Sequence, residues 1–147
     1  MKTYYAGIDA GSTYVKVALI DEDGLLAGYE RKTTGIDADG ASRNMLDAIL
    51  ESKDIGRNQL DQIVATGYSR RNIESAHDTV TEIMAHAAGA AWSSPDGLAI
   101  RTVVDIGGQD SKVIVIDDQG QISNFAVNDK CAAGTGRFLE SLARVLE

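Results

Sequence analysis

The pattern of hydrophobic and polar positions at the start of the chain contains three consecutive strand-like stretches, of which residues 14–20 alternate, and this predicts a meander of β-strands. The stretches cover residues 4–8, 14–20 and 25–31, and the first two are rich in β-branched and aromatic residues, as is typical of half-buried strands. Polar turns that contain glycine separate them at residues 9–13 and 21–24. Gly24 at the end of the second turn suits a tight hairpin.

The hydrophobic period changes after the meander. Apolar residues recur at helical spacing over residues 41–50, which predicts an amphipathic helix. We expect a short buried strand over 62–67, a helix over 70–77 with Ser69 as its N-cap, and an alanine-rich helix over 81–91. The small side chains of the alanine-rich helix suit either a hinge between lobes or a plain buried helix.

The opening pattern then recurs. Strands are expected over residues 99–104, 112–116 and 121–127, with turns at 105–111 and 117–120, and a last helix over 136–146. Because a repeated supersecondary unit indicates two related lobes, we predict an α/β protein with a first lobe over residues 1–96 and the start of a second lobe over 97–147.

Composition narrows the classes of protein that fit this pattern. The chain has 147 residues, of which 44% are hydrophobic, and this is enough for a packed core. The net charge of -8 argues against nucleic acid and anionic membranes as partners. The N-terminal residues carry no apolar signal segment, and the single cysteine excludes an internal disulfide. These features predict a cytoplasmic globular protein.

The first turn has the residue types of a phosphate and metal site. Gly11 permits close approach of the backbone to an oxyanion, and Ser12 and Thr13 add hydroxyl and amide donors. Asp9 ends the first strand and can orient a hydrated Mg²⁺, while Lys16 can place a cation nearby. One such turn by itself is also typical of an ordinary hairpin.

The second turn repeats this chemistry with Asp105, Gly107 and Gly108. Gln109 could orient a water molecule for attack on a γ-phosphate. Two such turns facing each other would clamp a polyphosphate with Mg²⁺ between them, so the repeat favours phosphate binding. Neither turn is a Walker-type loop, since the chain has no Gly-x-x-x-x-Gly-Lys-Ser/Thr run.

Cys131 lies in a run of small residues between a predicted strand and the last predicted helix. Gly134 and Gly136 let the backbone direct amide groups at the sulfur, and a helix N-terminus favours the thiolate. Such a thiolate can ligate a metal, hold an iron–sulfur cluster or act as a nucleophile. A lone cysteine in a turn can equally be buried and inert. His77 and His86 show no ligand spacing with it, and we expect both to be structural or surface residues.

Together these motifs resemble a known family. The turns at 9–13 and 105–112 look like the two phosphate loops of the acetate kinase, sugar kinase, Hsp70 and actin superfamily, which implies an actin-like (ribonuclease H-like) ATPase fold. The runs at 81–90 and 129–138 resemble the ATP-dependent activators of 2-hydroxyacyl-CoA dehydratases and their relatives in benzoyl-CoA reductases. The resemblance covers the whole chain, and the cysteine run is close to specific for the activators.

The resemblance implies a homodimer that holds one [4Fe–4S] cluster between its subunits. Binding and hydrolysis of ATP would drive an electron from this cluster into a partner dehydratase, and a ferredoxin or flavodoxin would supply the electron. Cys131 matches the first cluster ligand, Asp9 and Asp105 would position Mg²⁺, and Gln109 would position the attacking water. The phosphates of ATP or ADP would be held by Gly11, Ser12, Thr13, Lys16, Gly107 and Gly108.

The chain departs from the family pattern in one respect, because it has no second cysteine while each activator subunit supplies two. The adenosine-binding part of the fold is expected to lie beyond Glu147. We therefore expect an N-terminal fragment of a longer activator, with weak nucleotide binding of its own and uncovered apolar surface on its second lobe. Two alternatives stay open: a small-molecule kinase of the same superfamily, and a truncated module without catalytic activity.

Overall fold

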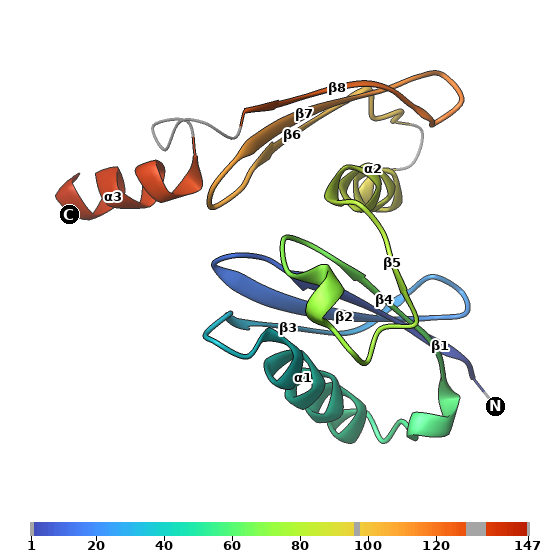
Figure 1. Cartoon of the computed structure of the whole chain (residues 1–147). Coiled ribbons are helices and arrows are strands. Elements are labelled where there is room, and N and C mark those ends of the chain that lie inside the picture. The colour runs from blue at the N-terminus through green and yellow to red at the C-terminus, as the bar shows by residue number, and fades with distance from the viewer. Residues whose placement is uncertain (1, 96–97, 129–134, 147) are drawn as a thin grey trace. The chain divides into compact units, whose positions relative to one another are not determined.

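The computed structural model describes residues 2–95, 98–128 and 135–146. The chain divides into two compact units, Met1–Thr81 and Glu82–Glu147. Each unit contains its own β-sheet, and the elements of both can be followed by their labels in Figure 1.

The first unit is built on a five-stranded mixed sheet with the order β3-β2-β1-β4-β5. Its strands are β1 (Tyr4–Ala10), β2 (Tyr14–Asp21), β3 (Leu26–Thr33), β4 (Leu60–Thr66) and β5 (Asp78–Thr79). β1, β2 and β3 form an antiparallel meander, whereas β4 runs parallel to both β1 and β5. The three opening strands and the later buried strand expected from the hydrophobic pattern are confirmed.

Helix α1 (Ala38–Ser52) packs on the meander and encloses the core of the first unit. Its apolar residues at helical spacing are buried against the inward-facing residues of β1 and β2. The largest of these fully buried side chains are Ile8, Leu19, Met45 and Leu46, and burial of each contributes about 1.5–3 kcal/mol. The helix begins earlier than predicted because the Asp37 carboxylate accepts a hydrogen bond of 2.8 Å from the Gly40 amide.

The helix predicted over residues 70–77 is wrong. Only a short 3₁₀ turn, η2 (Arg70–Asn72), forms there, and Ser69 makes no capping bond with its side chain. The chain instead returns to the edge of the sheet, where the His77 amide donates to the Ile63 carbonyl at 2.8 Å and the Ile63 amide donates to His77 Nδ1 at 3.1 Å. These bonds hold the segment in an extended conformation beside β4. The edge of a strand has unpaired N–H and C=O groups, and a helix could not bond to them because its own backbone groups are already paired. A second short 3₁₀ turn, η1 (Arg57–Gln59), leads into β4.

The second unit consists of a three-stranded antiparallel sheet and two helices. Its elements are α2 (Glu82–Ser93), β6 (Thr102–Ile106), β7 (Ser111–Ile116), β8 (Ile122–Asn128) and α3 (Gly136–Leu146). α2 packs on this sheet, with Ala87 buried beside Ile114 and Ile116. The predicted boundary near residue 96 had placed this helix in the first lobe, whereas its contacts group it with the second sheet. None of the described helices is long and apolar enough to cross a membrane.

The internal repeat predicted from the sequence is visible in the atomic detail of the two hairpins. In the first, the Asp21 carboxylate accepts hydrogen bonds from the amides of Asp23 and Leu25, and Gly24 adopts a φ of 76°. In the second, the Asp117 carboxylate accepts from Gln119 and Gln121, and Gly120 adopts a φ of 78°. Both units are therefore built around the same strand–turn–strand meander.

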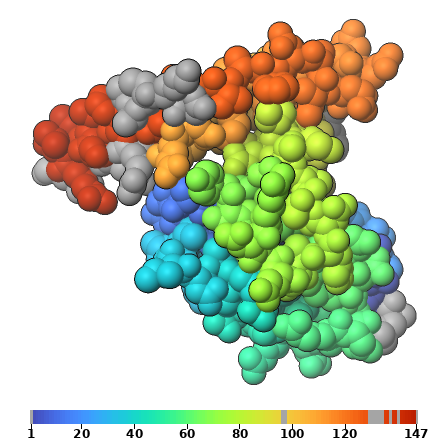
Figure 2. Space-filling view, in the orientation of Figure 1, coloured from blue at the N-terminus to red at the C-terminus, as the bar shows by residue number. Residues whose placement is uncertain are grey.

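The second unit also exposes apolar side chains, as expected from the sequence. Val104, Ile106, Val113 and Val115 lie on the face of the sheet opposite to the buried Ile114 and Ile116. Helix α3, drawn in red in the space-filling view of Figure 2, carries further exposed apolar residues. These are Phe138, Leu139, Leu142, Val145 and Leu146.

Candidate functional site

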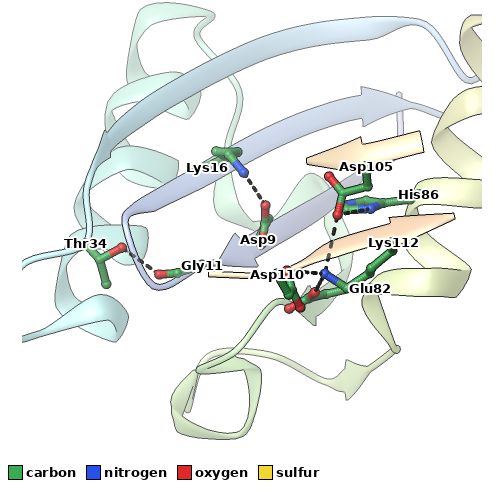
Figure 3. A network of polar contacts seen from close by, with 9 residues as sticks. All are labelled: Asp9, Gly11, Lys16, Thr34, Glu82, His86, Asp105, Asp110 and Lys112. Carbon is green, nitrogen blue, oxygen red and sulfur yellow. Dashed lines mark hydrogen bonds and ion pairs between the residues drawn. The ribbon is translucent and has the colours of Figure 1, made fainter. Parts of the chain in front are cut away.

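The first predicted phosphate turn lies at the carboxyl end of β1. Asp9 is paired across the strands with Lys16, and Lys16 Nζ lies 2.6 Å from Asp9 Oδ2 (Figure 3). The side chains of Asp9 and Lys16 are 23% and 42% exposed. Both charges are therefore accessible to a ligand.

The turn itself is held in shape by Gly11. Its amide donates to the Tyr14 carbonyl at 3.1 Å, and its carbonyl accepts from Thr34 Oγ1 at 2.7 Å. The Thr34 amide also donates to the Thr13 carbonyl. Ser12 is exposed at the tip of the turn, which is the arrangement needed for a hydroxyl and backbone amides to meet an oxyanion.

Gly67 is a site residue that the sequence analysis missed. The parallel pairing of β1 with β4 sets Asp9 opposite Thr66, so Gly67 reaches the same edge of the sheet. Ligands commonly bind where the carboxyl ends of parallel strands meet. Gly67 has a φ of 95°, and a Cβ there would lie 2.6 Å from Asp9 Oδ1 and from the Ala10 carbonyl oxygen. The one signal in the sequence was a glycine directly after a short apolar strand.

We predict that Gly67→Ala destabilises the first unit and disturbs Asp9. The left-handed conformation costs an alanine about 1–2 kcal/mol, and the collision with Ala10 and Asp9 adds about 1–3 kcal/mol. Gly24→Ala is the matched control, because Gly24 also has a positive φ but a Cβ there would meet nothing within 4 Å. The free energy of unfolding from denaturant titrations checks this. Equal losses in the two variants would show that the close approach to Asp9 carries no cost.

The second predicted turn repeats the geometry of the first. Asp105 is paired across β6 and β7 with Lys112, and the Gly107 amide donates to the Asp110 carbonyl at 2.9 Å. A Cβ on Gly107 would lie 2.7 Å from Asp110 Oδ1 and 3.1 Å from the Asp110 carbonyl oxygen, so a larger residue there would displace the Asp110 side chain. Gly108 and the exposed Gln109 complete the turn. Gly107, Gly108 and Gln109 thus lie in the turn between Asp105 and Asp110.

The second turn carries a charge cluster that sequence reasoning did not find. Lys112 Nζ lies 2.6 Å from Glu82 Oε2, 2.7 Å from Asp110 Oδ1 and 3.4 Å from Asp105 Oδ2 (Figure 3). His86 Nδ1 lies 3.3 Å from the same oxygen of Asp105. Glu82 and His86 both come from α2, a helix far from the turn in sequence, which is why local motifs did not reveal them.

These neighbours set the protonation of the cluster. The hydrogen bond from His86 outweighs the effect of burial and, together with the charge of Lys112, holds the pKa of Asp105 below its ordinary range. Burial by itself would lower the pKa of Lys112, but its bonds to Asp110 and Glu82 more than offset this and raise that pKa above its usual value. The Asp105 carboxylate and the Lys112 amine therefore both stay charged at neutral pH.

Cys131 falls outside the described residues, but the chain on either side of its run is placed. Asn128, at the end of β8, pairs with Ser111 at the start of β7. At the start of α3, the Gly136 amide donates to the Gly107 carbonyl at 2.8 Å. The described residues on either side of the run, Asn128 and Gly136, thus both contact the second turn.

The carboxylates suit Mg²⁺ bound together with a phosphate ligand. Within residues 2–95, 98–128 and 135–146, no group of three or more His, Cys, Asp and Glu side chains could hold a metal ion by itself. Mg²⁺ is usually bound by one or two carboxylates, several waters and the phosphates of a substrate. Asp9 and Asp105 are hard oxygen donors, and each is followed two residues later by the glycine of its turn, so each carboxylate fits that mode of binding.

Comparison with curated proteins shows relatives that match nearly the whole chain. The activator of lactoyl-CoA dehydratase from Anaerotignum propionicum is 42% identical over 144 residues, which are 98% of this chain and 54% of that protein. The (R)-2-hydroxyglutaryl-CoA dehydratase activating ATPase from Acidaminococcus fermentans is 38% identical over 148 residues, with 100% and 55% covered. The chain spans about half the length of the curated relatives it matches.

A solved structure supports the same grouping and fixes the fold. The activator of the 2-hydroxyisocaproyl-CoA dehydratase from Clostridium difficile with bound ADPNP superposes with a TM-score of 0.85 at 37% identity, covering 98% of this chain and 52% of that one. The actin-like α/β ATPase fold predicted from the paired turns is thereby confirmed. The model of the BadF/BadG/BcrA/BcrD ATPase family matches residues 6–147, and the chain therefore belongs to this family.

Proposed function

We propose that the protein containing this chain is an ATP-hydrolysing activator of a 2-hydroxyacyl-CoA dehydratase or a related CoA-thioester reductase. One observation carries the proposal: the same charged turn occurs twice. In each copy a lysine donates to the aspartate opposite it, and the amide of the turn glycine donates to a carbonyl three residues further on. The chain that contains this repeat is about 40% identical to proteins named as dehydratase activators. Because the charged turn is repeated, a role in binding a polyphosphate is favoured over the role of an ordinary hairpin turn.

In this proposal the residues of both turns bind ATP. Lys16 and the amides around Gly11, Ser12 and Thr13 would hold phosphate oxygens, as would those of Gly107 and Gly108. Asp9 and Asp105 would orient Mg²⁺ directly or through its waters, and the ion when bound would neutralise the charge on the phosphates. Gln109, which is exposed in its turn, would orient the attacking water.

The electron-transfer part of the proposal rests on the resemblance of the run at 129–138 to the activators. Cys131 would ligate a [4Fe–4S] cluster shared across a homodimer, with a ferredoxin or flavodoxin as the electron donor. Four thiolates are the usual ligand set of such a cluster. Since this chain offers one cysteine, the second thiolate of each subunit would come from sequence outside it.

An anaerobic coupling assay tests the function. The full-length protein, a chemical reductant and a purified 2-hydroxyacyl-CoA dehydratase component are mixed with and without ATP and Mg²⁺. Dehydratase turnover that requires ATP hydrolysis is the expected result. The kinase alternative predicts instead that phosphate is transferred from ATP to a small-molecule hydroxyl or carboxylate, with no iron and no effect on the dehydratase. A protein that neither binds ADP nor hydrolyses ATP would support the alternative of a module without catalytic activity.

A further inference from the structure

The two lysines that occupy matching positions in the repeat have different surroundings. Lys16 pairs across the strands with Asp9, and Lys112 pairs in the same way with Asp105. The side chain of Lys16 is 42% exposed, whereas that of Lys112 is only 6% exposed. A shared position in the repeat therefore does not give these two ammonium groups the same access to a ligand.

The ammonium group of Lys112 is fully engaged. A lysine has three N–H donors, and three carboxylates lie within 3.4 Å of Lys112 Nζ, those of Glu82, Asp105 and Asp110. In the part of the chain that the structure describes, Lys16 has Asp9 as its one carboxylate partner. Lys16 thus has donors left for a phosphate oxygen, while a phosphate could reach Lys112 only by displacing a buried ion pair, which is costly.

The contacts of Lys112 also connect separate elements of the second unit. Asp105 lies near the end of β6, Asp110 lies in the turn, and Glu82 is the first residue of α2. One helical turn further along α2, His86 reaches Asp105 directly. Figure 3 shows Lys112 at the centre of these side chains. α2 is therefore attached to the second turn at two points on one helical face.

We propose that the two matching lysines have different roles: Lys16 contacts the phosphates of the nucleotide, and Lys112 is a positioning residue that fixes Asp105 and Asp110 and ties them to α2. The first half of this proposal rests on the function proposed above, and the second half does not. A shift of α2 would then move the carboxylates of the second turn, because Glu82 and Lys112 transmit it through a short, buried contact.

Four forms of the full-length protein test the proposal: wild type, Lys16→Met, Lys112→Met and Glu82→Gln. Hydrogen exchange of residues 82–93 and 105–112 is measured without nucleotide, and binding of ADP with Mg²⁺ is measured by calorimetry. We expect both Lys112→Met and Glu82→Gln to speed exchange in both segments by about tenfold or more, since breaking buried ion pairs loosens local structure. Lys16→Met, in the other unit, should leave exchange there unchanged.

The binding data separate the two lysines. Lys16→Met should weaken ADP binding by about tenfold to a hundredfold, the usual loss for a charge-assisted hydrogen bond. Glu82→Gln keeps Lys112 and both aspartates, so its Kd for ADP should stay within about threefold of wild type, while kcat for ATP falls. Unchanged exchange in Glu82→Gln would overturn the link to α2. A loss of ADP affinity in Lys112→Met equal to that in Lys16→Met, with wild-type exchange, would make Lys112 a phosphate ligand.

The failure of the proposed function gives a different result. If the wild-type protein does not bind ADP, the assignment of Lys16 to phosphate and the proposed function both fall. The exchange measurement needs no nucleotide, so it still decides whether Lys112 and Glu82 hold the second turn to α2.

Discussion

Replacement of Asp9 by asparagine in the full-length protein is expected to lower kcat for ATP hydrolysis by about a hundredfold or more, because removal of a preorganised charged group from a phosphoryl-transfer site has effects of this size. An amide is neutral and a poorer ligand for Mg²⁺ than a carboxylate. The change also breaks the 2.6 Å ion pair with Lys16, which leaves the ammonium group without its anchor. A steady-state ATPase assay at saturating Mg²⁺ measures the effect, and Asp105→Asn should behave in the same way.

The fold should survive this substitution. The Asp9–Lys16 pair is partly exposed, and such pairs contribute only about 0–1 kcal/mol. Asp117→Asn is the matched control, because Asp117 serves a hairpin turn through two accepted hydrogen bonds of 2.9 Å, and an asparagine oxygen can keep this role. A wild-type hydrolysis rate in Asp9→Asn, or an equal loss of rate in Asp117→Asn, would remove Asp9 from the proposed metal site.

Replacement of Cys131 by serine should abolish the bound iron and the ATP-dependent activation of the dehydratase. Serine is a poor ligand for iron–sulfur clusters, whose iron is normally held by thiolates. Much of the ATPase activity should remain, since the proposed phosphate contacts use Lys16 and the two glycine turns. Iron content and ATP hydrolysis are measured on protein prepared without oxygen.

Asp9→Asn provides the reciprocal control for this experiment, because it should keep the iron and lose the hydrolysis. Together the two variants separate the cluster from the nucleotide site. Full retention of iron in Cys131→Ser would exclude this cysteine as a cluster ligand.

The local pattern of residue types along the chain determined the two β-meanders and their turns. Short strand-like stretches between polar turns predicted the strands, and Asp21 and Asp117 with the glycines that follow them set both hairpins. The pairs Asp9–Lys16 and Asp105–Lys112 also follow from the sequence, since a short turn between antiparallel strands fixes which residues lie opposite each other. The two Asp–Lys turns could therefore be located without a structure.

Other parts of the site depended on contacts between residues far apart in the sequence. The segment 70–77 has a helical pattern, but Ile63 of β4 recruits His77 to the sheet edge. Gly67 approaches Asp9 only because β4 lies parallel to β1. Glu82 and His86 reach the second turn because α2 packs on β6 and β7. The sequence by itself determined the turns, since their hydrogen bonds join near neighbours. The tertiary structure decided the surroundings of the charges, because burial and pairing depend on which elements pack together.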